Sequence, residues 1–133
     1  MSDKVAVNIA TSKGTGILHN QAIVANGVVY CSGQVPADLT TGEIIAGGIQ
    51  EHTHQCIRNL SAVLEEAGSC LEKAVKVNVF ITDMKNFAAM NEVYVQYWGA
   101  VKPVRTCVCV RDLPRGADVE IECTALAGKE SKL

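Results

Sequence analysis

Residues that could bind and activate a small molecule gather in the last third of the chain. Arg105 and Cys107 alternate with apolar residues in one β-branched segment, and Glu120 does so in a second segment of the same kind. Successive side chains of a strand point to opposite faces, so residues two apart share a face. A guanidinium, a thiol and a carboxylate on one sheet face could form a binding site for a small anion. This combination predicts a site for a small anionic substrate.

The two segments, residues 104–110 and 118–125, are expected to pair as an antiparallel hairpin across the turn-forming residues 111–117. In such a hairpin Arg105 would lie close to Glu120. The core-facing side would consist of Val108, Val110, Val119 and Ile121, and the other side would add Cys109 and Glu122. A plain cross-strand ion pair, worth roughly 0.2–1 kcal/mol, explains the same pattern and is the commoner occurrence.

Periodic apolar residues elsewhere predict the elements that position these segments. Alternation predicts strands, and a spacing of three and four predicts helices. An Asn-Gly pair at residues 26–27 predicts a hairpin turn, and the Gly- and Pro-rich residues 32–48 predict a connection that could hold a site. The expected strands cover residues 5–9, 22–25, 28–31 and 75–82; the expected helices cover residues 51–67, capped by Gly68, and residues 87–98.

The resulting order, β-β-β-α-β-α-β-β, predicts an α+β fold with a mixed β-sheet and two helices packed on one face. The 133 residues and 14.2 kDa match one domain, expected over residues 1–133. A net charge of −2 leaves no positive field for nucleic acid, and no apolar run is long enough to span a membrane. The composition therefore predicts no nucleic-acid partner and no membrane association.

The six cysteines and the paired histidines are weak metal candidates. Most of the cysteines lie in apolar periodic segments, which predicts buried thiols rather than disulfides. There is no Cys-x-x-Cys pair, and Cys107-x-Cys109 alone is insufficient for zinc. His52 and His54 project in different directions from a helix and are expected to face solvent. We expect no metal.

Longer stretches carry a family resemblance. Residues 102–110, followed by Leu113-Pro114 and residues 119–122, resemble the signature segment of the RidA/YjgF (reactive intermediate deaminase) family. Further similar stretches lie at residues 32–36, 41–44, 77–84 and 87–94. The resemblance covers nearly the whole chain.

This resemblance implies a chorismate-mutase-like subunit that forms a homotrimer with active sites between subunits. Such proteins hydrolyse reactive 2-imino acids and enamines to 2-keto acids and ammonia, without a cofactor. In this chain Arg105 would clamp the substrate carboxylate, Cys107 would line the pocket, and Glu120 would activate water. The backbone near Gly33 and the side chain of Asn91 would position the substrate.

His19 marks a departure from the family pattern, because the family often has a tyrosine at this position. In related deaminases the aromatic ring packs over the substrate, so the change bears on substrate range and on activity. His19 could titrate near neutral pH and join the chemistry, but a surface or interface histidine is the commoner occurrence in a loop.

Other functions stay open at this point. Some relatives have been described as endoribonucleases, although the acidic composition argues against RNA binding. A non-catalytic trimer that binds small carboxylates, or one that acts as a chaperone, would need Arg105 but not Glu120. A relative that deaminates 2-aminomuconate-like enamines is the nearest enzymatic alternative.

The last three residues suggest a location. A terminal Ser131-Lys132-Leu133 matches a peroxisomal address, which predicts a peroxisomal protein, with a cytoplasmic one as the alternative.

Overall fold

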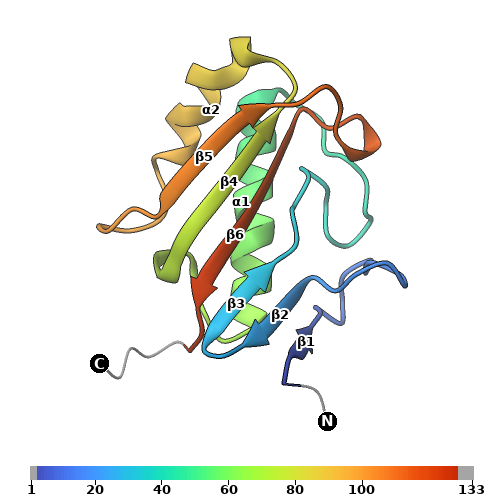
Figure 1. Ribbon diagram of the computed structural model, residues 1–133. Coiled ribbons are helices and arrows are strands. Elements are labelled where there is room, and N and C mark those ends of the chain that lie inside the picture. The colour runs from blue at the N-terminus through green and yellow to red at the C-terminus, as the bar shows by residue number, and fades with distance from the viewer. Residues whose placement is uncertain (1–2, 129–133) are drawn as a thin grey trace.

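A six-stranded sheet with two helices on one side forms the protein (Figure 1), and the computed structural model describes residues 3–128. The predicted order of strands and helices is confirmed, with three short 3-10 helices added. The strands are β1 (Val5–Val7), β2 (Ala22–Ala25), β3 (Val28–Cys31), β4 (Ala74–Ile81), β5 (Val104–Cys109) and β6 (Val119–Leu126). The helices are α1 (Ile49–Glu66), α2 (Phe87–Tyr94), η1 (Leu71–Lys73), η2 (Met84–Asn86) and η3 (Pro114–Gly116).

The Asn-Gly hairpin between β2 and β3 is confirmed. Asn26 and Gly27 have φ values of 51° and 76°, the left-handed conformation that a two-residue hairpin turn requires at both positions. The two strands pair antiparallel, with Ala25 opposite Val28. The turn therefore sets the register of this hairpin by local chemistry alone.

The predicted hairpin between β5 and β6 is wrong. The sheet order is β1-β2-β3-β6-β4-β5, so β6 pairs antiparallel with both β3 and β4. Strand β5 lies at the edge and pairs parallel with β4. The connection through η3 carries the chain across the end of β4 instead of folding it back (Figure 1).

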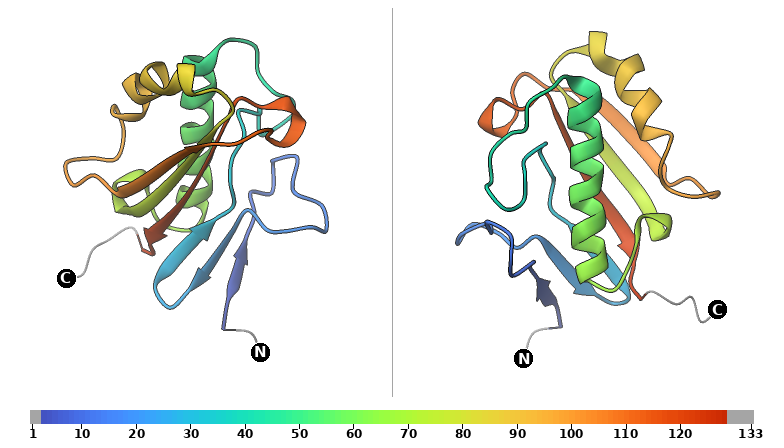
Figure 2. Two further views of the ribbon diagram at one scale, coloured as in Figure 1. Left: turned by 45° about the horizontal axis from the view of Figure 1, so that its top comes forward. Right: turned by 180° about the vertical axis from the view of Figure 1, so that it is seen from behind.

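Helix α1 begins at its N-cap Gly48 with the glutamate half of a capping box, and it lies along the sheet. The Glu51 carboxylate accepts a hydrogen bond from the Gly48 backbone N–H at 2.9 Å, which satisfies one free donor of the first turn. Hydrogen bonds from the backbone N–H groups of Glu51 itself and of Gly48 lower the pKa of the Glu51 carboxyl group. At the other end Gly68 has a φ of +81°, as the predicted cap requires. Figure 2 shows α1 and α2 on the same face of the sheet.

Helix α2 is shorter than its sequence predicts. It ends at Tyr94, and Trp98 follows with a φ of 85°, outside the helix but still only 1% exposed. The Trp98 indole N–H donates to the Tyr94 carbonyl at 3.0 Å. The regular spacing of the aromatic residues therefore indicates which side chains are buried. It does not indicate where the helix ends.

The core lies between the sheet and the helices. Buried side chains come from the same face of β3, β4 and β6, and from the stripe of α1 that packs on them. The largest fully buried side chains are Trp98, Ile57, Leu60, Leu64, Ile81, Met90 and Ile121.

The opposite face of the sheet carries apolar side chains that no helix covers. Tyr30, Val104 and Leu126 are 50%, 66% and 45% exposed, and Val108, predicted to face the core, is 42% exposed. Val119 and Ile121 are buried as predicted. None of the helices within residues 3–128 is both long and apolar enough to cross a membrane.

Candidate functional site

Glu120 lines a pocket of about 540 Å³ beside the connection between β3 and α1. Its carboxylate projects from the face of β6 opposite the helices, since Val119 and Ile121 on either side are buried in the core. The connection runs along one wall of the pocket, and the segment after β1 forms another. The lining residues are Ser12, Lys13, Gly14, Thr15, His19, Gln21, Ser32, Gly33, Gln34, Val35, Ala37, Asp38, Leu39, Gly42, Pro114, Arg115, Glu120 and Glu122.

Gly33 lies directly against the Glu120 carboxyl group. A Cβ atom added at Gly33 would stand 2.9 Å from Cδ of Glu120 and would come closer still to Oε2. Two backbone hydrogen bonds between Gln34 and Ile121, of 2.8 and 3.0 Å, hold the two chain segments at this separation. Only glycine leaves room for the carboxylate here.

The environment of Glu120 favours its neutral form. Burial raises the pKa of Glu120, and the negative charge of Glu122 raises it further. Glu122 lies two residues along on the same face and accepts a hydrogen bond from Asn78 Nδ2 at 2.9 Å. A carboxyl group with a raised pKa is suited to general acid–base chemistry near neutral pH.

The same pocket contains residues that the sequence analysis did not single out. Lys13 and Arg115 bring positive charge to its wall, and Asp38 brings negative charge. Arg115 has a φ of 61°, unusual for a residue with a side chain. No motif marks these residues, because they come from separate loops that only the fold brings together.

Arg105 lies in a second cluster, between β5 and α2. Its Nη1 donates to Oδ1 of Asn91 at 2.7 Å. Its guanidinium carbon lies 4.7 Å from the ring centre of Tyr94 and 5.8 Å from that of Phe87. Within residues 3–128, no ion pair to a carboxylate within 4.0 Å is found for Arg105. The guanidinium is therefore held in place while most of its N–H groups stay free to bind an anion.

Cys107 and Tyr94 complete this second cluster. Burial raises the pKa of the Cys107 thiol despite the nearby charge of Arg105, so the thiol is neutral at physiological pH. Burial also raises the pKa of Tyr94 to about 12. The Tyr94 hydroxyl is buried with no hydrogen-bond partner among the described residues. A neutral thiol argues against Cys107 as a nucleophile.

The structure brings the predicted site residues together in two groups rather than one. His19, Gly33 and Glu120 share the pocket, whereas Arg105, Asn91 and Cys107 form the cluster beside α2. The prediction that Arg105 and Glu120 share a sheet face is wrong. Strand β4 separates β5 from β6, and the two side chains project from opposite faces.

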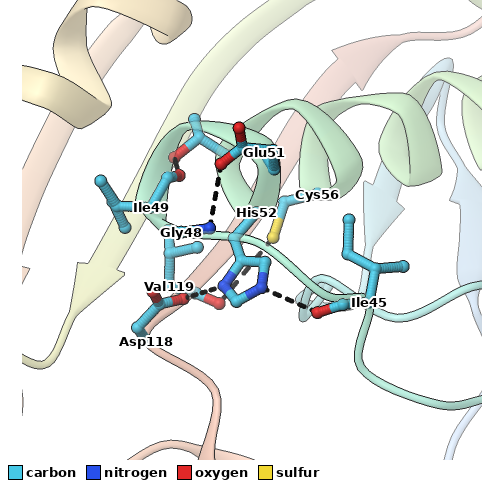
Figure 3. Close-up of polar contacts among 9 residues, drawn as sticks. Ile45, Gly48, Ile49, Glu51, His52, Cys56, Asp118 and Val119 are labelled. Carbon is cyan, nitrogen blue, oxygen red and sulfur yellow. Dashed lines mark hydrogen bonds and ion pairs between the residues drawn. The ribbon is translucent and has the colours of Figure 1, made fainter.

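Polar residues on the buried side of α1 hold the pocket connection in place. Nδ2 of Asn59 donates to the Ala37 carbonyl at 2.8 Å. His52 contacts two elements at once, because Nδ1 lies 2.7 Å from Oδ1 of Asp118 and Nε2 lies 2.9 Å from the Ile45 carbonyl oxygen (Figure 3). These contacts fix the connection to both the helix and β6.

The prediction that His52 and His54 face solvent is wrong. His52 is only 9% exposed, and Nδ1 of the partly buried His54 lies 2.7 Å from the Tyr97 hydroxyl. The two rings do diverge as predicted. In the part of the chain that the structure describes, no group of three or more His, Cys, Asp or Glu side chains could hold a metal ion.

The cysteines are free thiols. Cys31, Cys56 and Cys123 are buried, Cys70 and Cys107 are half-buried, and Cys109 is exposed. The prediction of burial therefore holds for three of the six.

Comparison with known proteins identifies the family. Residues 16–127 match the family model described as Endoribonuclease L-PSP. The human 2-iminobutanoate/2-iminopropanoate deaminase is 33% identical over 130 residues, covering 96% of this chain and 95% of the relative. This chain thus belongs to the L-PSP family, which is the RidA/YjgF family of the sequence resemblance.

Solved structures support the fold. The crystal structure of yeast Mmf1 matches with a TM-score of 0.88 and 38% identity, covering 93% of this chain and 98% of the other. The structure of E. coli TdcF with bound serine matches with a TM-score of 0.85 and 33% identity, covering 93% and 99%. The α+β class with a mixed sheet and two helices is therefore confirmed.

The predicted peroxisomal location is contradicted by the relatives, as is the cytoplasmic alternative. Protein mmf1, mitochondrial, of Schizosaccharomyces pombe is 48% identical over 129 residues, covering 95% of this chain and 78% of the relative. Protein mmf2, mitochondrial, of the same organism is 45% identical, covering 92% and 97%. These relatives point to mitochondria. The Ser131-Lys132-Leu133 motif behind the prediction lies outside the described residues.

Proposed function

We propose that the protein hydrolyses reactive 2-imino acids to 2-keto acids and ammonia, in a homotrimer whose sites lie between subunits. Arg105 of one subunit binds the substrate carboxylate, and Glu120 of a neighbouring subunit acts on water. The family membership, the deaminase relative and the two clusters described above support this proposal.

The observation that carries the proposal is the separation of two complementary groups. The Arg105 guanidinium has N–H groups available to bind an anion, and the Glu120 carboxyl group, which lines the pocket, has a raised pKa. The two side chains nevertheless lie on opposite faces of the sheet. A 2-imino acid is too small to reach both faces of one sheet. A second subunit is therefore needed to complete the site.

The uncovered face of the sheet supports this assembly. Its exposed apolar side chains, among them Tyr30, Val104, Val108 and Leu126, form a surface that a soluble subunit rarely leaves open. A closed ring of subunits would bury it and would place the edge strand β5 beside the pocket of a neighbour. That the ring contains three subunits is implied by the family resemblance.

In the proposed reaction the Glu120 carboxylate takes a proton from water as the oxygen attacks C2 of the imine. The proton then passes to the nitrogen of the resulting carbinolamine. In the collapse of the carbinolamine the Glu120 carboxylate takes the hydroxyl proton and passes it to the nitrogen, the C2–N bond breaks, the C=O bond forms, and ammonia leaves. The Arg105 guanidinium holds the carboxylate on C1 throughout, and its hydrogen bond to Asn91 and its packing on Tyr94 fix its orientation. Cys107 lines the site without forming a covalent bond.

Substrate preference depends on the first pocket. His19 lines this pocket where related deaminases often have tyrosine, so an imidazole ring replaces a phenol ring. We propose that His19 and the Gly33 backbone bound the space beside the imine carbon. The shape of the pocket wall formed by His19 and Gly33 then determines which imino acids fit best.

The direct experiment measures clearance of 2-iminopropionate or 2-iminobutyrate generated in place by an amino acid oxidase and trapped with semicarbazide. Faster clearance that Arg105→Ala and Glu120→Ala each abolish supports the proposal. A protein that binds the products but does not speed clearance would favour the non-catalytic carboxylate-binding alternative. Cleavage of RNA with a steep dependence on salt would favour the endoribonuclease of the family description.

We also propose a mitochondrial location, following the names of the two fission yeast relatives. Cell fractionation against a mitochondrial matrix marker tests it, and recovery in another fraction would contradict it.

A further inference from the structure

Two cations that the proposed reaction does not use line the same pocket as Glu120. Lys13 comes from the segment after β1, and Arg115 comes from η3. Both side chains are exposed, whereas Glu120 is half-buried. Within residues 3–128, no carboxylate oxygen is found within 4.0 Å of either cation. Like charges that face one pocket add their fields, so the outer part of this pocket attracts an anion.

The carboxylates of the pocket are engaged elsewhere. Oδ1 of Asp38 accepts hydrogen bonds from the backbone N–H groups of Thr40 and Thr41 at 2.8 and 3.0 Å. The Glu122 carboxylate accepts its hydrogen bond from β4. Burial and Glu122 raise the pKa of Glu120, and neither cation offsets this increase. Among the described residues, the two cations are therefore left to bind an anion that enters the pocket.

The backbone fixes the position of both cations. The Lys13 N–H donates to the Leu39 carbonyl at 2.7 Å, and the Lys13 side chain packs over Gly42, where an added Cβ would stand 3.1 Å from its Cγ. Arg115 has a φ of 61°, a costly conformation of the kind that clusters at functional sites. Figures 1 and 2 show η3 and the segment after β1 on either side of the connection between β3 and α1.

The size of the pocket leaves room for a substrate with a longer side chain. A volume of about 540 Å³ lies in the range that holds drug-sized ligands, and an imino acid with three or four carbons is much smaller. A longer side chain would extend from the imine carbon beside Glu120 toward the exposed cations. Asp38 on the same wall limits the positive charge, which favours a carboxylate over a phosphate at this end.

We propose that Lys13 and Arg115 bind a second carboxylate on the substrate side chain, so that the protein prefers dicarboxylic 2-imino acids. The C1 carboxylate then binds Arg105 of the neighbouring subunit, and the imine carbon lies beside Glu120. The terminal carboxylate binds the two cations at the outer part of the pocket. The inference rests on the proposed function as far as the reaction is concerned, but the preference for a second carboxylate is also a property of binding.

The kinetic test compares the imines that amino acid oxidases generate from glutamate and from alanine, each trapped with semicarbazide. In the wild type, kcat/KM for the glutamate-derived imine should exceed that for the alanine-derived imine by about 10-fold or more. Lys13→Gln and Arg115→Gln should each lower this ratio about 3- to 10-fold, as expected for one charged hydrogen bond that is partly exposed to solvent. A ratio near one in the wild type, or a ratio that both substitutions leave unchanged, would overturn the inference.

Arg111→Gln is the matched control. Arg111 precedes η3, lies outside the pocket, and has its side chain 3.6 Å from the Asp112 carboxylate. Its replacement removes the same charge from the same connection and should leave the ratio unchanged. A ratio that falls as much in Arg111→Gln as in Arg115→Gln would mean that net charge, rather than the pocket, selects the substrate, and would contradict the proposal.

Binding of the keto acid products distinguishes failure of this inference from failure of the proposed function. By calorimetry, 2-oxoglutarate should bind about 10-fold more tightly than 2-oxobutyrate, and this difference should shrink in Lys13→Gln, in Arg115→Gln and at high salt. If the wild type clears no imine but shows the difference, the proposed function fails and the carboxylate site stands. If the wild type clears imines but binds both keto acids equally, the proposed function stands and this inference is overturned.

Discussion

Replacing Gly33 by alanine separates the chemistry of the site from the stability of the fold. The new Cβ would lie 2.9 Å from Cδ and 3.1 Å from Cγ of Glu120, both inside ordinary contact distance. The carboxyl group is the flexible end of its side chain, so it would move away by about 0.5 Å or more rather than distort the sheet. A displacement of about 1 Å in a catalytic group costs on the order of 10²-fold in rate.

The expected result for Gly33→Ala is a fall in kcat on the order of 10²-fold with little change in stability. The backbone of Gly33 lies outside the left-handed region, so alanine fits its conformation, and the free energy of unfolding should change by less than about 1 kcal/mol. Imine clearance gives the rate, and thermal or urea unfolding gives the stability.

Gly48→Ala is the matched control. Its added Cβ would come no closer than 3.7 Å to Oε1 of Glu51, and its φ of −105° suits alanine. It changes a helix cap outside the pocket and should leave kcat unchanged. If Gly33→Ala clears imine as fast as the wild type, the position of the Glu120 carboxylate does not limit the reaction and the reasoning is refuted.

Three further predictions follow from the same contacts. Arg105→Lys should lower kcat/KM on the order of 10- to 100-fold in clearance assays, because lysine cannot make the paired hydrogen bonds; retained efficiency would contradict the carboxylate clamp. Asn91→Ala should raise KM more than it lowers kcat, since it frees Arg105 from its 2.7 Å contact; an unchanged KM would argue against that role. Burial and Glu122 raise the pKa of Glu120, so kcat/KM should rise with pH, with a midpoint above the pKa of an ordinary glutamate. Glu122→Gln should move this rise only partly to lower pH, since burial is the larger cause. A pH profile that Glu122→Gln leaves unmoved would assign the rise to another group.

Local chemistry explains which parts of the fold the sequence predicts. The Asn26-Gly27 turn and the Gly68 cap depend on backbone conformations that few residues adopt, so they can be recognised without knowing the rest of the molecule. The alternation in β5 and β6 likewise predicts strands. It identifies the buried face of β6 but not that of β5, where Val108 is 42% exposed. It contains no information on partners, and a parallel edge strand alternates in the same way as a hairpin strand.

The arrangement of the candidate site could not be predicted from the sequence. Sequence resemblance singled out Arg105, Asn91, Gly33 and Glu120, yet the pairing order that places them in two clusters depends on contacts far apart in the chain. The burial of His52, in contrast, has a local signal in the sequence. His52 falls on the same stripe of α1 as Cys56, Asn59 and Val63, so its burial follows from helical spacing.

Mixed trimers test the central claim most directly. In the proposed homotrimer, Arg105→Ala and Glu120→Ala proteins should each be inactive. Subunits of the two kinds, unfolded together and refolded in equal amounts, should regain clearance of 2-iminopropionate. If each site takes Arg105 from one subunit and Glu120 from the next, about a quarter of the sites are complete after random mixing. Recovery near that fraction of the wild-type rate is the predicted result. No recovery from well-folded mixed trimers, alongside an active wild type, would contradict a site shared between subunits.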